Sequence, residues 1–321
     1  MSGRTPLWLT VLAVYLVACL TGCAKQTTVT LRFAPQETTT YKVSTGMIKD
    51  FRFEQPSLTP PKLREEQSGP TVDVTFQQRI DKVQSDGSAL ATVTIKDVAY
   101  TVKDKNTLKF DFDSTRQADK NKPLAKIIGQ SYTIKISPAG VVEVVDAKDA
   151  RNAVTAGYEG KIAKVFFDDN GIKRRHTILA LPDIDKSTLK PGVSWSRIVG
   201  SPPGLLAPKS FEKTYTLVSV QGPKDNRIAT ILMNAVESAE PAPDTEKQPA
   251  GMGIFANMFD ATETYTGKMV LELGTGKVLQ YNEKLVATYL AAEEPRDKSG
   301  DKGPDTLMMR LTRSISMEIV E

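Results

Sequence analysis

Few side chains of this 321-residue chain are of the types that catalysis most often uses. There is one histidine, His176, and there are two cysteines, Cys19 and Cys23. A zinc site of cysteine and histidine needs more ligands than this. A histidine base also needs an oriented carboxylate and a nucleophile or water. The sequence indicates neither, so we expect His176 at a helix C-terminus, where the macrodipole favours such side chains.

Two pairs of aspartates are further candidates for chemistry. Asp111 and Asp113, and likewise Asp183 and Asp185, lie two residues apart and would share one face of a strand. Such a pair could hold Ca²⁺ or hydrolyse a glycoside. Calcium needs about six to eight oxygen ligands, and no aspartate-rich loop supplies the others. We therefore predict that these aspartates lie on solvent-exposed faces of the sheet and do not bind a metal.

Basic residues gather near the histidine, at Lys161, Lys164 and residues 173–175. They could contact anionic head groups, since each basic residue near such a surface gains about 1 kcal/mol. Asp168 and Asp169 neighbour them, so the local charge is mixed. We favour a solvated face.

Motifs for the common enzyme and nucleotide-binding classes do not occur in the sequence. There is no phosphate-binding loop, no Gly-x-Gly-x-x-Gly after a strand, no Gly-x-Ser-x-Gly and no His-Glu-x-x-His. We therefore predict a protein that is not an enzyme and has no nucleic-acid partner. The alternative is a hydrolase that uses carboxylates alone, which needs two acids about 5–9 Å apart in a pocket.

The N-terminus has the pattern of an export signal. Residues 7–20 are almost all apolar, and Arg4 is the only charged residue before Lys25. Spanning a bilayer takes roughly 20 apolar residues, whereas the apolar region of a signal peptide needs about 7–15. We interpret residues 1–22 as a signal peptide rather than as a buried helix.

The residues that follow, Leu20, Thr21, Gly22 and Cys23, resemble the lipobox of bacterial cell-envelope lipoproteins. The resemblance implies cleavage before Cys23, which is acylated and whose sulfur is tied up as a lipid thioether, with palmitate among the acyl chains. Cys19 is then removed, so no disulfide forms. We expect no cofactor other than this covalent lipid, whose acyl chains contribute about 0.8 kcal/mol per buried CH₂ and hold the protein at a membrane.

The predicted location is the cell envelope. Ala24 and Lys25 follow the cysteine, and by resemblance to the lipoproteins of diderm bacteria this favours the outer membrane, facing the periplasm. In a monoderm the anchor would lie in the outer face of the plasma membrane. A tether of about five residues from Cys23 to the first strand reaches at most roughly 17 Å, so the folded body stays close to the bilayer.

Most of the mature chain alternates apolar and polar residues with the period of two that half-buried strands have. Clear examples lie at residues 29–33, 91–95, 132–136 and 269–273. One buried and one wet face is typical of antiparallel sheets. We predict a mainly β fold (β-rich α+β) of roughly a dozen strands.

One region interrupts this pattern and is predicted to be helical. It opens near Asp146 with a capping arrangement and runs through residues 147–169, broken at Gly157 and Gly160, with Gly171 as its stop. The predicted organisation is a first β unit at residues 23–145, a helical connector at 146–190 and a second β unit at 191–321.

A faint internal repeat favours two related, curved antiparallel sheets. Residues 91–95 match 229–233 at an offset of 138, and Tyr132 with its following turn matches Tyr265 at an offset of 133. The alternative is that any two meanders of short strands look alike.

Two turn motifs carry a second resemblance. The hairpin at residues 129–140 and the Pro-Gly-x-Ser-Trp opening at residues 191–195 are similar to an uncharacterised family of β-rich envelope lipoproteins. These motifs are structural, so the resemblance implies no functional residue.

Four segments rich in proline, glycine or charge are predicted to be mobile excursions between strands, at residues 55–70, 200–209, 237–249 and 293–305.

The apolar residues 251–259 end one of these excursions. In a helix, Ile254, Phe255, Met258 and Phe259 would lie on one side. They form either a plug in the core, or an apolar lid or contact for a membrane or partner. Residues 204–206 are a weaker candidate of the same kind.

These observations predict a lipid-anchored envelope lipoprotein that acts as a non-catalytic interaction or scaffold module, or as a module that binds a hydrophobic ligand. Its partners would be the membrane and either a lipid or an envelope protein. A lipid carrier would need a contiguous apolar cavity, which sequence alone does not reveal.

Overall fold

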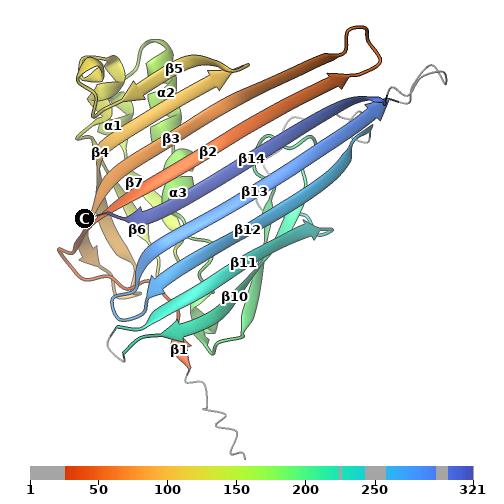
Figure 1. Cartoon of the computed structure of the whole chain (residues 1–321). Helices are drawn as coiled ribbons and strands as arrows, with labels where there is room; N and C mark the ends of the chain where they lie inside the picture. Colours follow the sequence, from red (N-terminus) through yellow and green to blue (C-terminus); the bar gives the residue numbers. More distant parts are fainter. Residues whose placement is uncertain (1–25, 224–225, 243–257, 294–302, 321) are drawn as a thin grey trace, which may run out of the picture.

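The computed structural model describes residues 26–223, 226–242, 258–293 and 303–320. A single antiparallel sheet of 12 strands dominates the described chain (Figure 1). Eleven strands follow the spatial order β7-β6-β4-β3-β2-β14-β13-β12-β11-β10-β9, and β5 pairs with β4 off this path. The prediction of a mainly β fold is confirmed. No helix among the described residues has both the length and the apolar character that crossing a membrane requires.

The strands of the large sheet have the following bounds: β2 Thr38–Gln55, β3 Lys62–Val83, β4 Ala89–Asp104, β5 Thr107–Asp113, β6 Ser131–Ile136, β7 Val142–Asp146, β9 Ser194–Gly200, β10 Ser210–Gln221, β11 Ile228–Ser238, β12 Asp260–Glu272, β13 Lys277–Glu293 and β14 Asp305–Ile319. Two short strands, β1 (Thr27–Thr28) and β8 (Thr188–Leu189), form a separate two-stranded sheet.

The sheet is continuous through the ladder between β2 and β14, which runs from the pair Tyr41–Ile319 to the pair Glu54–Thr306. The two predicted β units are therefore halves of one sheet, each a meander on its own side of this ladder. The matched segments occupy corresponding strands, because β4 and β6 are neighbours in one half and β11 and β12 in the other. The duplication itself stays a prediction.

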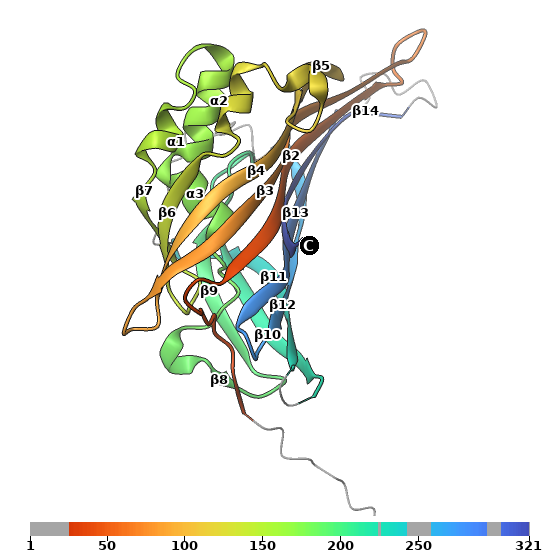
Figure 2. The ribbon, with the colours of Figure 1, turned by 90° about the vertical axis from the view of Figure 1, so that its left-hand side faces the viewer.

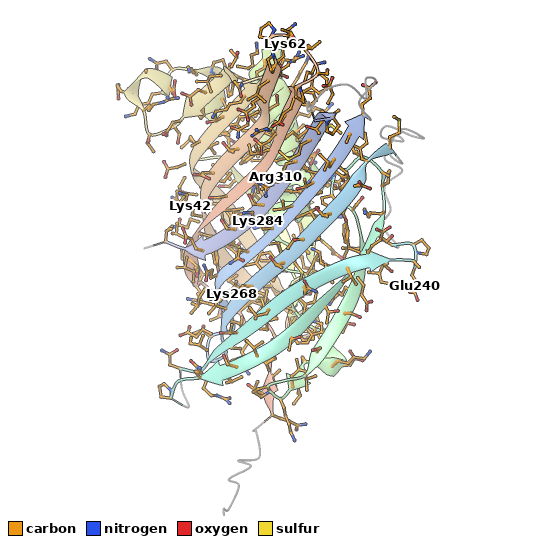
Figure 3. All side chains as sticks on the ribbon, turned by 45° about the vertical axis from the view of Figure 1, so that its right-hand side comes forward. Lys42, Lys62, Glu240, Lys268, Lys284 and Arg310 are labelled. Atoms are coloured by element: carbon orange, nitrogen blue, oxygen red, sulfur yellow. The ribbon has the colours of Figure 1, made fainter. Side chains whose placement is uncertain are left out.

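The alternating sequence divides the sheet into a buried and a solvated face. Tyr41 and Val43 of β2 are buried, and β3 pairs Phe76 and Val74 with them. The sheet is strongly curved, and the helices pack on the side of its concave face (Figure 2). Charged side chains such as Lys42, Lys268, Lys284 and Arg310 lie on the opposite, convex face (Figure 3).

The helical layer lies between β7 and β8 in the chain and consists of α1 (Lys148–Asn152), α2 (Gly157–Phe167) and α3 (Asp169–His176). Asp168 caps α3, since its side chain accepts a hydrogen bond from the Gly171 amide. Ile172 and His176, four residues apart, are the buried residues of α3.

The predicted break at Gly160 and the predicted stop at Gly171 are wrong. Gly160 lies inside α2 and does not break the helix. A Cβ at this position would come 2.6 Å from the carbonyl carbon of Thr155, so the glycine lets the Thr155 backbone pack close to the helix. Gly171 lies in the first turn of α3 rather than after the last helix, because Asp168 starts a new helix.

Two predicted mobile excursions are also corrected. Residues 62–70 belong to β3, whose ladder with β2 continues to the pair Gln55–Lys62. Residues 201–209 connect β9 to β10 and return to the core, since Leu205 is 7% exposed. Of residues 237–249 and 293–305, the parts at 243–249 and 294–302 lie outside the described residues.

Candidate functional site on the concave face

Three charged residues occupy concave-face positions at which the alternation would place an apolar side chain. Lys213 lies between Phe211 and Tyr215 on β10, whereas Glu283 of β13 and Arg313 of β14 interrupt similar series. The three come from strands that the large sheet brings together, and each has buried apolar residues around it. A charged side chain in an apolar environment costs free energy unless it has hydrogen-bond or ion-pair partners. The role of each of the three residues therefore depends on its contacts.

Lys213 and Glu283 form a buried cluster with two tyrosines. The Lys213 Nζ lies 2.5 Å from the Glu283 Oε2. The Tyr265 hydroxyl donates to the same oxygen at 3.0 Å, and the Tyr281 hydroxyl donates to Oε1 at 2.5 Å. The Lys213 ammonium also lies 4.5 Å from the centroid of the Tyr265 ring. Both oxygens of Glu283 therefore have donors, as a buried carboxylate requires.

The electrostatics of this cluster follow from burial. Burial lowers the pKa of Lys213, and the neighbouring Glu283 opposes that shift. Burial, followed by the charge of Glu283, raises the pKa of both Tyr265 and Tyr281, so both remain neutral hydrogen-bond donors.

Next to this cluster, three buried polar atoms have no hydrogen-bond partner among the described residues: the Tyr215 Oη, the Trp195 Nε1 and the Arg197 Nε. The side chain of Tyr215 is fully buried, and its ring stacks on Trp195 with centroids 6.0 Å apart. Burial raises the pKa of Tyr215, which leaves a neutral hydroxyl with a proton to donate. A buried group without a partner costs about 1–3 kcal/mol, so this side of the cluster favours an added acceptor.

Arg313 lies on the same face, where its neighbours in the ladders are Leu285 and Met47. It is half-buried, and the structure gives its guanidinium no ion pair or hydrogen bond with any described residue. Burial lowers the pKa of Arg313, and the positive charge of Arg174 on α3 acts in the same direction.

Residues 201–209 cover part of this face and are here called the strap. Leu205 is buried, and a Cβ on Gly204 would lie 3.4 Å from the Leu311 side chain. At its base the Ser201 amide donates to the Lys209 carbonyl at 2.7 Å, and the Lys209 amide donates to the Ser201 Oγ at 3.1 Å. The apolar candidate at residues 204–206 thus lies against the sheet.

An apolar strip continues from the strap toward the ends of β2 and β14. It consists of the half-buried side chains of Met47, Phe51, Phe53, Leu307 and Met309. The exposed Lys49, which pairs with Leu311, lies on the same face between Met47 and Phe51. The register pairs Phe51 with Met309 and Phe53 with Leu307, so these side chains share the concave face. The seven residues from Met47 to Phe53 span about 20 Å of strand.

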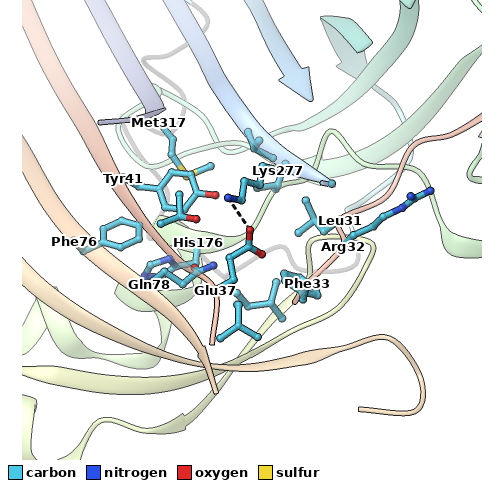
Figure 4. A pocket seen from close by; sticks show the side chains of 16 residues that line it. Leu31, Arg32, Phe33, Glu37, Tyr41, Phe76, Gln78, His176, Lys277 and Met317 are labelled. Carbon is cyan, nitrogen blue, oxygen red and sulfur yellow. Dashed lines mark ion pairs between the residues drawn. The ribbon is translucent and has the colours of Figure 1, made fainter. Parts of the chain in front are cut away.

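A small cavity lies at the other end of the concave face (Figure 4). Its volume is about 50 Å³, and Tyr41, His176 and the ion pair between Glu37 and Lys277, 2.7 Å apart, lie along its wall. A water needs about 10–15 Å³ and ligand sites measure about 300–1,000 Å³, so this cavity holds a few waters only.

His176 ends α3, as predicted, and it packs into the core. Its Nε2 lies 2.7 Å from the Tyr132 Oη, and Arg175 donates to that oxygen at 3.0 Å. Because a guanidinium can only donate, the Tyr132 hydroxyl accepts from Arg175 and donates to Nε2. Burial lowers the pKa of His176 well below its usual value, so the ring is neutral.

The aspartate pairs have structural contacts. Asp111 pairs with Arg116 at 2.5 Å, and Asp113 accepts from the Thr115 amide at 2.9 Å. Asp183 and Asp185 flank the start of a 3₁₀ turn at Ile184–Lys186 rather than sharing a strand face, which corrects the prediction. The described residues contain no group of three or more side chains that could hold a metal ion.

The remaining predicted site residues are only partly within the structure. Leu20, Thr21, Gly22 and Cys23 lie outside the described residues, as do Ile254 and Phe255. Met258 is 68% exposed, whereas the neighbouring Phe259 packs partly buried against the core. The lid or contact proposed for this segment stays a prediction.

Sequence reasoning did not identify Lys213, Glu283 or Arg313. The signal that could have found them is a charge at an apolar position of an otherwise regular alternation, as in Leu311-x-Arg313-x-Ile315.

No family model matches this chain, and no curated protein matches it. Among solved structures, a structure on lipid–protein interactions in lipovitellin is similar, with a TM-score of 0.40 and 10% identity. The alignment covers 90% of this chain and 26% of the lipovitellin chain, so this chain spans about a quarter of that protein.

Proposed function

We propose that this protein is a lipid-anchored, non-catalytic lipoprotein of the cell envelope that binds an elongated apolar ligand on the concave face of its sheet. The observation that carries the proposal is the apolar strip, which extends the core beyond the strap. Contiguous apolar surface of this kind is typical of sites for ligands, membranes or partner proteins.

The shape of the strip supports a long, narrow ligand. Its side chains lie along two paired strands, β2 and β14, rather than around a closed pocket. Where the strap crosses the sheet, Leu205 contributes a buried apolar side chain from a connection that is otherwise rich in proline and glycine. A ligand with an acyl chain can replace such contacts along the sheet without breaking a backbone ladder.

The proposed anchor places the body close to a source of such ligands. Strand β1 begins at Thr27, four residues after Cys23, and Val29 is already fully buried. Four residues reach at most about 14 Å, so an acylated Cys23 would hold the described body beside the bilayer.

The two alternatives from the sequence receive less support. A carboxylate-based hydrolase needs two acids facing one pocket. Among the described residues that line the small cavity, Glu37 is the one carboxylate, and Lys277 is paired with it. A larger pocket of about 550 Å³ is lined by Asp168 and Asp169, but Asp168 caps α3 and Asp169 is paired with Arg151. A scaffold role would use the same apolar strip for a protein partner.

The experiment uses photoactivatable hexadecanol and palmitate, each with a diazirine on the chain, and the lipidated full-length protein in phosphatidylcholine nanodiscs. Met309→Asp places a charge on the strip, and Met308→Asp is its matched control, half-buried on the convex face of the same strand. We expect crosslinks to β2 and β14 in the wild type and in Met308→Asp, and a yield about tenfold lower in Met309→Asp. Equal yields in the two variants, or no crosslink with either probe, would overturn the proposal and favour a scaffold.

A further inference from the structure

We propose that the ligand of the concave face is an anionic amphiphile whose carboxylate or phosphate head group is bound by the guanidinium of Arg313. This inference rests on the proposed function and names the chemical class of its ligand. Arg313 is not an isolated surface charge, because its position, its surroundings and its missing partner each point to an anion.

The position of Arg313 is the inner end of the apolar strip. On β14 the same face continues through Leu311 and Met309 to Leu307, and the seven residues from Arg313 to Leu307 span about 20 Å. A head group at Arg313 would therefore leave a chain of acyl length lying along the strip. Lys49 pairs in register with Leu311, the next pair on this face after that of Arg313, so both cations lie at one end, and the apolar track consists of the pairs beyond them. This arrangement fits an amphiphile better than a hydrocarbon.

The charge of Arg313 is uncompensated. Glu283 is the carboxylate whose charge reaches it, but Lys213 and two tyrosine hydroxyls already occupy both oxygens of Glu283. Lys213 and Glu283 cancel, which leaves the positive charge of Arg313. Lys49, which lies on the same face, and Arg174, exposed on α3, add further positive charge near this site.

A guanidinium remains protonated in proteins, so the cost of burying the charge of Arg313 cannot be reduced by loss of a proton. Half-burying such a charge among Met47, Leu285 and Leu311 without an acceptor is costly, and an anion would remove that cost. The planar fork of arginine suits two oxygens at once, which carboxylates and phosphates both offer.

A second unsatisfied group belongs to the same cluster. The Tyr215 hydroxyl is fully buried and has no partner among the described residues, and the charge of Glu283 acts on it as on Arg313. The Tyr215 Oη, Trp195 Nε1 and Arg197 Nε are therefore donors without acceptors among the described residues beside Glu283. The Glu263 Oε1, on the same face, lies 2.9 Å from the Lys209 ammonium. An electron-rich head group is the ligand chemistry that matches such a surplus of donors.

The experiment compares palmitate with hexadecanol, and phosphatidylglycerol with diacylglycerol, as photoactivatable probes in the same nanodiscs. Arg313→Met removes the charge and keeps an apolar side chain of similar length. Arg310→Met, an exposed arginine on the convex face of the same strand, is the control.

We expect the wild type and Arg310→Met to crosslink at least one anionic probe about tenfold better than its neutral counterpart, and Arg313→Met to lose that preference. Preference for palmitate alone would identify a fatty acid, and preference for phosphatidylglycerol alone a phospholipid. Arg313→Lys, which keeps the charge without the fork, should retain part of the preference, and it serves as the test if Arg313→Met does not fold.

Neutral and anionic probes that crosslink equally well to the wild type, or a preference that survives in Arg313→Met, would overturn this inference while leaving the proposed function intact. If no probe of either kind crosslinks, the proposed function itself fails.

Discussion

Lys213 and Glu283 form an ion pair 2.5 Å long although their strands, β10 and β13, are separated in the sheet by β11 and β12. The small residues on the two strands between them make this ion pair possible. Lys213 is paired in register with Ala235, and Glu283 with Gly267. Because these neighbours have little or no side chain, the two long side chains can fold toward each other over the intervening strands.

Gly267→Ala tests the importance of that space. A Cβ at this position would lie 2.7 Å from the Asn282 carbonyl oxygen and 3.2 Å from the Glu283 Cγ. We expect a loss of about 1–3 kcal/mol in the free energy of unfolding, from overpacking. Urea denaturation measures it. Gly303→Ala, where a Cβ would meet nothing within 4 Å, is the control and should unfold at an unchanged urea concentration.

Lys213→Met should be more damaging alone than together with Glu283→Gln. The single substitution leaves Glu283 buried without its counter-charge and should cost about 3–5 kcal/mol. The double variant removes both charges, so much of this loss should return. A double-mutant cycle on the free energy of unfolding measures the coupling, and strictly additive losses would contradict a coupled pair.

The buried histidine predicts a pH dependence of stability. The pKa of His176 is lowered by burial in the folded state, so between that value and the unfolded value of about 6.5 the unfolded chain binds more protons. The stabilisation is complete above about pH 6.5 and is lost as the pH falls below it, by up to about 1.4 kcal/mol per pH unit.

His176→Gln is the matched variant for this effect, because its amide can still accept from the Tyr132 hydroxyl. Its free energy of unfolding should fall less steeply than that of the wild type between about pH 6.5 and 5.5, by chemical denaturation. Parallel curves for the two proteins would show that His176 does not titrate on unfolding.

The predicted lipid anchor is tested by metabolic labelling. Cells that express the wild type should incorporate labelled palmitate into the protein, whereas Cys23→Ser should incorporate none, because the serine hydroxyl does not replace the thiol as acceptor. Ala24→Ser, one residue away, should be labelled normally. Label in the Cys23→Ser variant would contradict acylation at this residue.

Local pattern predicted the strands whose two faces differ most. The alternation at residues 91–95 and 132–136 led to the observed strands β4 and β6, and the basic end of α3 placed His176 correctly. The same alternation at residues 29–33 was misleading, because these residues follow β1 and form no strand.

The outer part of the β2–β3 hairpin was missed because it is held by backbone pairing and by surface ion pairs, such as Arg52 with Glu65 at 3.1 Å. Residues 62–70 of β3 are mainly polar on both faces, which leaves no hydrophobic period to detect.

The candidate site was harder to predict for a different reason. Charges at apolar positions are visible in the sequence, but Lys213 and Glu283 are 70 residues apart, and their contact depends on the register of three ladders. The burial of Leu205 likewise depends on the curvature of the sheet beneath a connection that local sequence marks as a loop. Neither relationship is encoded within one segment.

The most direct test of the account is native mass spectrometry of the full-length protein, gently extracted from its own membranes. The account predicts a population whose mass exceeds that of the acylated chain by one non-covalently bound anionic lipid, and loss of this lipid in Met309→Asp but not in Met308→Asp. A protein that carries its covalent acyl chains and no other lipid, in the wild type and in both variants, would contradict ligand binding on the concave face.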